Sequence, residues 1–83
     1  MLIPSPKDLA LLITNQRKKL KLSQAEVGKL VGLKQQTISE FEIKPENTQL
    51  NTLFRILSAL NLDIKVSAKN EVSVTKTRWK EEW

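Results

Sequence analysis

The most constraining feature of this sequence is a short helical segment that must stop at Gly32. Ser23 and Glu26 have the spacing of a capping box, in which each side chain accepts a hydrogen bond from the backbone amide of the other. A helix is therefore expected to begin at Ser23. Its apolar face is supplied by three residues: Val27, Leu30 and Val31. Gly32 can then adopt the left-handed conformation that ends a helix and that a side chain would penalise.

A second short helix follows almost at once, from residue 34 or 35 to residue 42. Its apolar residues, Ile38 and Phe41, lie about one turn apart, and most of its other residues can form hydrogen bonds. Ala25 is the small residue expected to face this helix. Two short helices joined by a tight turn containing glycine form a helix-turn-helix when they lie inside a bundle. We predict this motif over residues 23–42.

Further helices are expected on both sides of the motif. Ser5 and Pro6 suit the N-cap and the first position of a helix. Its apolar stripe is Leu9, Leu12, Ile13 and Leu20. After a loop at residues 45–48, Thr48 can cap a fourth helix that stops near Asn61. The apolar residues of that helix are Leu50, Leu53, Phe54, Leu57 and Leu60. The predicted fold is all-α, a bundle of four to five helices.

The pattern changes after residue 61, where apolar and polar residues alternate as in a strand. One short strand is not stable alone, because its edge groups go unpaired. We therefore predict that a strand pairs across a dimer through Ile64, Lys65, Val66 and Ser67. The alternative is an internal hairpin with residues 72–75. The predicted division is a helix-turn-helix and dimerisation domain at residues 1–67 and a flexible tail at residues 68–83.

The composition excludes several classes of site. The chain has 83 residues with no cysteine and no histidine, so disulfides, cysteine-based metal sites and histidine-dependent nucleophiles are ruled out. Without a glycine-rich phosphate loop either, we expect no enzyme, no metal and no cofactor. No apolar run is long enough to span a bilayer, and residues 9–13 are too short for a signal-peptide core. We expect a soluble protein of the reducing cytoplasm, without a membrane partner.

The charge distribution points to a polyanionic partner. The formal net charge is +5, and residues 1–34 alone carry seven basic and two acidic side chains. The N-terminal half is therefore the part expected to face a polyanion. The alternative is a solvated, lysine-rich face, in which the cations at residues 17–21 mainly complement a helix C-terminus.

Candidate DNA-binding residues gather at the start of the second motif helix, the end that points at base edges in docked helix-turn-helix proteins. They are Lys34, Gln35, Gln36, Thr37 and Ser39. Glutamine can pair with adenine, and lysine can donate to guanine. Gln24 can hold a phosphate at a helix N-terminus, or it can simply fill space beside the capping box. Lys44 and Asn47, in the following loop, are expected to contact the DNA backbone.

Two acidic residues of this helix have other expected roles. Glu40 would repel phosphate if it faced DNA, but it could accept from a cytosine amino group. Glu42 is expected to form an internal hydrogen bond or salt bridge.

Residues 23–42 resemble the lambda-repressor/Xre type of helix-turn-helix, and this resemblance covers roughly residues 6–61. Residues 34–42, 45–48 and 53–57 further resemble HipB antitoxins, as does the chain end, Glu82-Trp83. In two departures from that pattern, Gln36 replaces a smaller residue and Glu40 stands where asparagine is common.

The resemblance implies a lambda-repressor-like, homodimeric autorepressor of a toxin–antitoxin operon. Its partners would be a palindromic operator and a HipA-like serine/threonine kinase toxin. Operator contacts are implied for Lys34, Gln35, Gln36 and Ser39. Residues 64–67 lie where subunits of that family pair strands. Trp83 resembles a residue that docks on the toxin, and Trp79 in the same tail is a second candidate.

Three alternatives remain from the residues alone. The chain could be a free-standing phage-type or Xre repressor without a toxin. It could also be a protein-interaction adaptor that uses the fold without reading DNA. Trp83, finally, could fold back onto its own domain instead of anchoring an interface.

Overall fold

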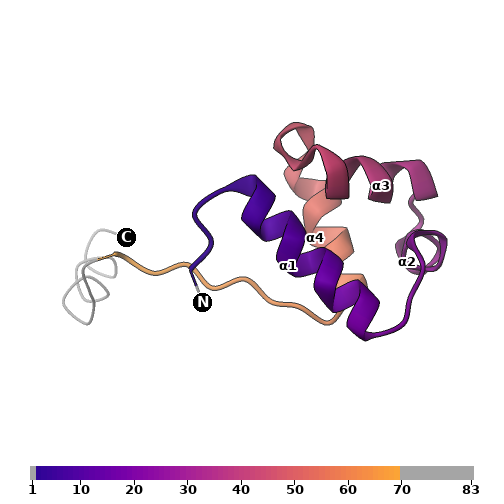
Figure 1. Ribbon diagram of the computed structural model, residues 1–83, viewed down its shortest axis with the longest axis horizontal. Helices are drawn as coiled ribbons and strands as arrows, with labels where there is room; N and C mark the ends of the chain where they lie inside the picture. The colour runs from indigo at the N-terminus through magenta and orange to yellow at the C-terminus, as the bar shows by residue number, and fades with distance from the viewer. Residues whose placement is uncertain (1, 70–83) are drawn as a thin grey trace, which may run out of the picture.

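The computed structural model describes residues 2–69, which form a small all-helical bundle (Figure 1). Its elements are α1 (Pro6–Lys19), α2 (Gln24–Val31), α3 (Gln35–Ile43), the 3-10 helix η1 (Pro45–Asn47) and α4 (Leu50–Ala59). This confirms the predicted all-α class and the helix-turn-helix, which is formed by α2 and α3. None of the helices in this part of the chain is long and apolar enough to cross a membrane.

The helix ends are set mainly by local chemistry. The Ser5 hydroxyl accepts from the Asp8 amide at the start of α1, where Pro6 is the first helical residue. The capping box of α2 is complete, and Gly32 ends that helix in the left-handed region, with φ 71°. Asn61 follows α4 with φ 58°, as its predicted role as a stop requires. These ends follow the sequence prediction.

The start of α4 differs from the prediction. Gln49, rather than Thr48, is the N-cap residue, and its side chain makes no capping hydrogen bond. The reason is that the preceding loop is itself helical. The Thr48 amide donates to the Pro45 carbonyl at 3.0 Å, so Thr48 closes the turn of η1 and does not open α4.

The core gathers residues from all four α-helices. Eight apolar residues are buried: Ala10, Ile13, Val27, Ile38, Phe41, Ile56, Leu57 and Leu60. The predicted core placement of Leu20 and Leu30 is wrong, because these side chains are 41% and 61% exposed. Leu20 lies beyond the end of α1 as its C-cap. Leu30 lies outside the core, because the buried residues of α2 are Val27 and Gly28.

The close approach at the motif turn depends on Gly28. Ala25, the predicted small residue at the helix contact, is exposed. Gly28 is buried instead, and a Cβ at this position would overlap the carbonyl oxygen of Leu33. The Leu33 amide also donates to the Gly28 carbonyl at 2.8 Å. The turn therefore folds back onto α2 at Gly28, one helical turn later than predicted.

The segment after α4 leaves the helical bundle as an extended trace (Figure 1). Residues 62–68 form no strand in the single chain. A strand needs a neighbour to form its ladder hydrogen bonds, and the prediction assigns this neighbour to a second subunit. The predicted tail lies almost wholly outside the described residues, as do the strand partner at residues 72–75, Trp79 and Trp83.

Candidate nucleic-acid interface

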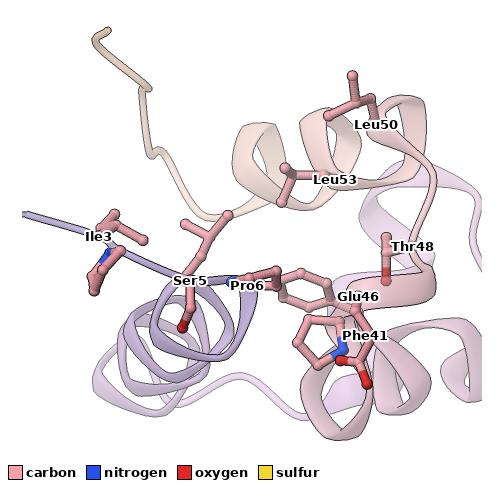
Figure 2. A pocket seen from close by; sticks show the side chains of 11 residues that line it. Ile3, Ser5, Pro6, Phe41, Glu46, Thr48, Leu50 and Leu53 are labelled. Carbon is pink, nitrogen blue, oxygen red and sulfur yellow. The ribbon is translucent and has the colours of Figure 1, made fainter. Parts of the chain in front are cut away.

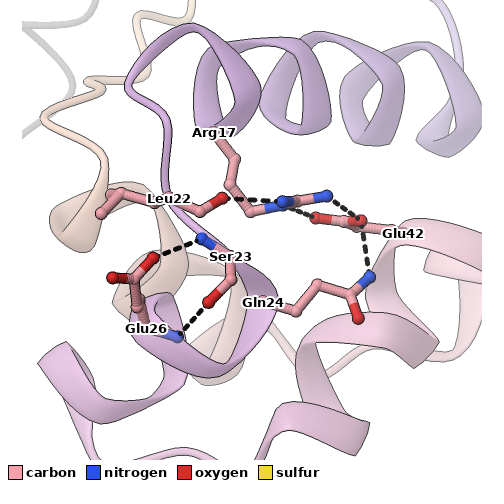
Figure 3. Close-up of polar contacts among 6 residues, drawn as sticks. All are labelled: Arg17, Leu22, Ser23, Gln24, Glu26 and Glu42. Atoms are coloured by element: carbon pink, nitrogen blue, oxygen red, sulfur yellow. Dashed lines mark hydrogen bonds and ion pairs between the residues drawn. The ribbon is translucent and has the colours of Figure 1, made fainter.

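A polar network fixes α3 against α1 and α2 (Figure 3). Arg17 Nε donates to Glu42 Oε2 at 2.7 Å, and Nη2 donates to Oε1 at 3.1 Å. The third contact of the guanidinium is Nη1 to the Leu22 carbonyl, at 2.8 Å. The Arg17 and Glu42 side chains are only 12% and 9% exposed. This two-point ion pair confirms the internal role predicted for Glu42 and links α3 to α1.

Gln24 belongs to the same network. Its Nε2 donates to Glu42 Oε1 at 2.9 Å, which links the first residue of α2 to the end of α3. The side chain is half-buried. Gln24 therefore does more than fill space beside the capping box. The second N–H of its Nε2 and the backbone amides at the α2 N-terminus are the donors with which it could hold a phosphate.

The capping box beside Gln24 holds a charged group in place. The Ser23 amide donates to Glu26 Oε1 at 2.7 Å, and the Glu26 amide donates to the Ser23 hydroxyl at 3.0 Å (Figure 3). The backbone hydrogen bond from Ser23 lowers the pKa of Glu26, and the Ser23 hydroxyl and the charge of Lys29 lower it further. A carboxylate at this helix N-terminus also suits the helix dipole.

The start of α3 presents polar side chains to solvent. Lys34 is the N-cap residue, with no side-chain capping bond, and Lys34, Gln35 and Gln36 are exposed. Thr37 and Ser39 are half-buried. Because Ile38 and Phe41 hold the opposite side of α3 in the core, this end of the helix is free to enter a groove.

A hollow beside α3 places two further predicted residues, Lys44 and Asn47, beside Thr37. It measures about 290 Å³ and is lined by Thr37, Glu40, Lys44, Asn47 and Thr48. Lys44 and Asn47 thus lie next to α3, as a phosphate contact would require.

One contact on this surface was missed from the sequence. Gln36 Nε2 donates to Glu40 Oε2 at 3.3 Å. The four-residue spacing of a glutamine and a glutamate within one helix is the signal that could have predicted it.

The family follows from comparison with known proteins. The helix-turn-helix family model matches residues 13–66. Antitoxin HipB from Escherichia coli (strain K12) is 39% identical over 82 residues, which cover 98% of this chain and 93% of that protein.

This chain belongs to the HipB antitoxin family.

Solved HipB structures agree with this assignment. A chain of the HipA-HipB-O2-O3 complex matches with a TM-score of 0.82 and 38% identity, over 84% of this chain and 99% of that one. A chain of the HipB-O4 20mer complex matches over the same shares with a TM-score of 0.81 and 38% identity. The HipB-like fold of this chain therefore extends well beyond the helix-turn-helix.

The remaining site predictions for this HipB-family chain fall after α4. Ile64, Lys65, Val66 and Ser67 are all exposed, and Val66 is 92% exposed. The predicted toxin-binding residues, Trp79 and Trp83, lie outside the described residues.

An apolar pocket lies on the N-terminal side of the bundle and shares Thr48 with the hollow beside α3 (Figure 2). It measures about 360 Å³ and lies between the N-terminal arm, the end of α3, η1 and the start of α4. Ile3, Pro6, Phe41 and Leu53 are among the residues that line it, and none of the predicted DNA-binding residues does.

Proposed function

We propose that this chain is a DNA-binding antitoxin that represses its own toxin–antitoxin operon and binds a HipA-like serine/threonine kinase toxin. The observation that carries the proposal is the polar, exposed start of α3 on a HipB-like fold. The solved relatives include HipB in complex with a 20mer and with HipA. The chain acts as a regulator rather than an enzyme, and it works in the cytoplasm, where the operon and the toxin are found.

The DNA-reading surface is the start of α3 with its neighbours. Lys34, Gln35, Gln36 and Ser39 contact base edges, and Thr37 reaches a base or a phosphate. Two loop residues, Lys44 and Asn47, contact the DNA backbone. The amide end of α2 at Gln24 holds a further phosphate.

The dimer forms through residues 64–67. Ile64 is 42% exposed and Val66 is 92% exposed, so two apolar side chains on one face of the segment remain at least partly open within the described residues 2–69. Residues 64–67 of the two subunits pair into a two-stranded sheet. Ile64 and Val66 lie on one face of this sheet, and Lys65 and Ser67 lie on the other. This arrangement would set two α3 helices about 34–36 Å apart, one turn of DNA, and match a palindromic operator.

The toxin-binding part is the tail. Residues 1–67 form the DNA-binding and dimerisation domain, and residues 68–83 form a flexible tail that carries Trp79 and Trp83. Tryptophan anchors interfaces well, because it buries a large apolar area at one point.

Co-purification from the expressed native operon tests the proposal. We expect a stoichiometric kinase-like partner to be retained by the wild-type chain and lost from Trp83→Ala, while operator binding is unchanged. Deletion from Val72 onward should abolish retention in the same way. If no partner is retained, and if the deletion leaves every activity intact, the chain is a free-standing repressor.

A further inference from the structure

Gln36 and Glu40 form a hydrogen-bonded pair on the exposed side of α3. Gln36 Nε2 donates to Glu40 Oε2 at 3.3 Å, and both residues are exposed. They lie four residues apart, so they share one face of the helix, whereas Ile38 and Phe41 hold the other face in the core. The pair therefore lies on the side of α3 that is open to DNA.

The Glu40 carboxylate on the exposed side of α3 restricts which DNA groups can lie next to this helix. Glutamate oxygens only accept, so they repel phosphate oxygens and the acceptors of bases. In the major groove, guanine presents two acceptors, thymine presents an acceptor and a methyl group, and adenine presents an amino group beside the N7 acceptor. Cytosine alone presents an amino donor with no acceptor of its own beside it. Among base edges, cytosine is the one that suits Glu40.

Building on the proposed function, we propose that Glu40 is a specificity-determining residue that selects a cytosine in each operator half-site. Its free carboxylate oxygen accepts from the cytosine amino group. Gln36 is a positioning residue for Glu40, because its amide holds the other oxygen. The second N–H and the oxygen of that amide stay available for a neighbouring base.

Lys44 makes this arrangement compatible with DNA. It lines the same 290 Å³ hollow as Glu40, together with Asn47. A cation beside the carboxylate reduces the repulsion between Glu40 and the phosphates that flank the groove.

Selection from a random-sequence duplex library tests the pair, with the full chain as bait. The wild type should prefer cytosine about tenfold at one position of each half-site. Glu40→Gln should move that preference to adenine, because an amide both donates and accepts. Gln36→Ala should weaken the cytosine preference, and Gln36→Lys, which keeps a donor, should retain it. Asn15→Ala, an exposed change on α1, is the matched control and should select the wild-type site.

The outcomes separate this inference from the proposed function. If the wild type enriches a site but Glu40→Gln selects the same base at every position, Glu40 does not read cytosine. If Gln36→Ala keeps the full preference, Gln36 does not position Glu40. If the wild type enriches no site, both the inference and the proposed DNA-binding function fail. Equal thermal midpoints for all variants would show that the changes in preference do not come from unfolding.

Discussion

Among single residues, Gly28 and Gly32 lack a side chain for two different reasons. Gly28 has no room, because a Cβ would overlap the Leu33 carbonyl. Gly32 has open space around it, but its φ of 71° is a conformation that side chains disfavour.

We therefore expect both glycine-to-alanine changes to destabilise the fold. Replacement by asparagine should restore stability at only one of the two positions. Gly28→Ala should cost about 1–3 kcal/mol from overpacking, and Gly32→Ala about 1–2 kcal/mol from the left-handed backbone. Asparagine tolerates that backbone, so Gly32→Asn should recover stability, whereas Gly28→Asn should not. Urea denaturation followed by circular dichroism measures each change. A stable Gly28→Ala variant would contradict the close approach at Leu33.

The capping glutamate predicts a pH dependence. The pKa of Glu26 is lowered below its ordinary value of 4.5 by its hydrogen bonds to Ser23. A carboxyl group whose pKa is lower in the folded state stabilises the fold at pH values above its unfolded-state pKa. This stabilisation is lost as the pH falls through its folded-state pKa. The free energy of unfolding of the wild type should therefore exceed that of Glu26→Gln at pH 7, and the difference should shrink below pH 4.5. Gln can keep the capping box without the charge. A stability difference between the two proteins that does not vary with pH would therefore show that it does not come from the ionised Glu26 carboxylate.

Between secondary-structure elements, the Arg17–Glu42 ion pair connects α1 to α3. Removing Glu42 alone leaves the Gln24 side-chain amide without its acceptor and leaves a poorly exposed guanidinium with the Leu22 carbonyl but no counter-charge. Glu42→Ala should cost about 3 kcal/mol, at the low end for buried pairs because some exposure remains. The double change Arg17→Met with Glu42→Leu should cost less than the two single changes added together. Chemical denaturation of Arg17→Met, Glu42→Leu and the double variant measures the coupling, and simple additivity would argue against a working ion pair.

The helices could be predicted from the sequence where local chemistry sets them. Ser5, the Ser23–Glu26 box and Gly32 each act within a few residues, and each was predicted in its observed role. The face that a helix buries depends on distant neighbours. Leu50 and Phe54 of α4 are 70% and 54% exposed, whereas Ile56, absent from the predicted stripe, is buried. The apolar spacing alone did not distinguish these faces.

In the site, too, local features could be predicted from the sequence but contacts between distant residues could not. The cluster of polar residues at the start of α3 was predictable, because helix position places it away from Ile38 and Phe41. The bond from Gln24 to Glu42 spans 18 residues in sequence. No local pattern indicates such a contact, because it exists only when α2 and α3 are packed together.

For the whole molecule, the proposed dimer accounts for the apolar face left open after α4. Replacing Ile64 and Val66 together with aspartate would place like charges opposite each other in the proposed sheet, which destabilises cross-strand pairs. We expect this variant to be monomeric by light scattering while its helices stay folded. Asp63→Thr, outside the proposed strand, should remain dimeric. A dimeric double-aspartate variant would exclude pairing through residues 64–67.

The most direct test of the account is a fluorescence anisotropy titration of the full chain with a duplex from its own promoter and with a scrambled duplex. The wild type should prefer the promoter duplex, and its affinity should fall steeply as salt rises. Gln35→Ala should lose about 1–3 kcal/mol on the promoter duplex only, whereas Asn15→Ala should bind like the wild type. Equal affinity of the wild type for both duplexes, or unchanged promoter binding by Gln35→Ala, would contradict DNA reading by the start of α3.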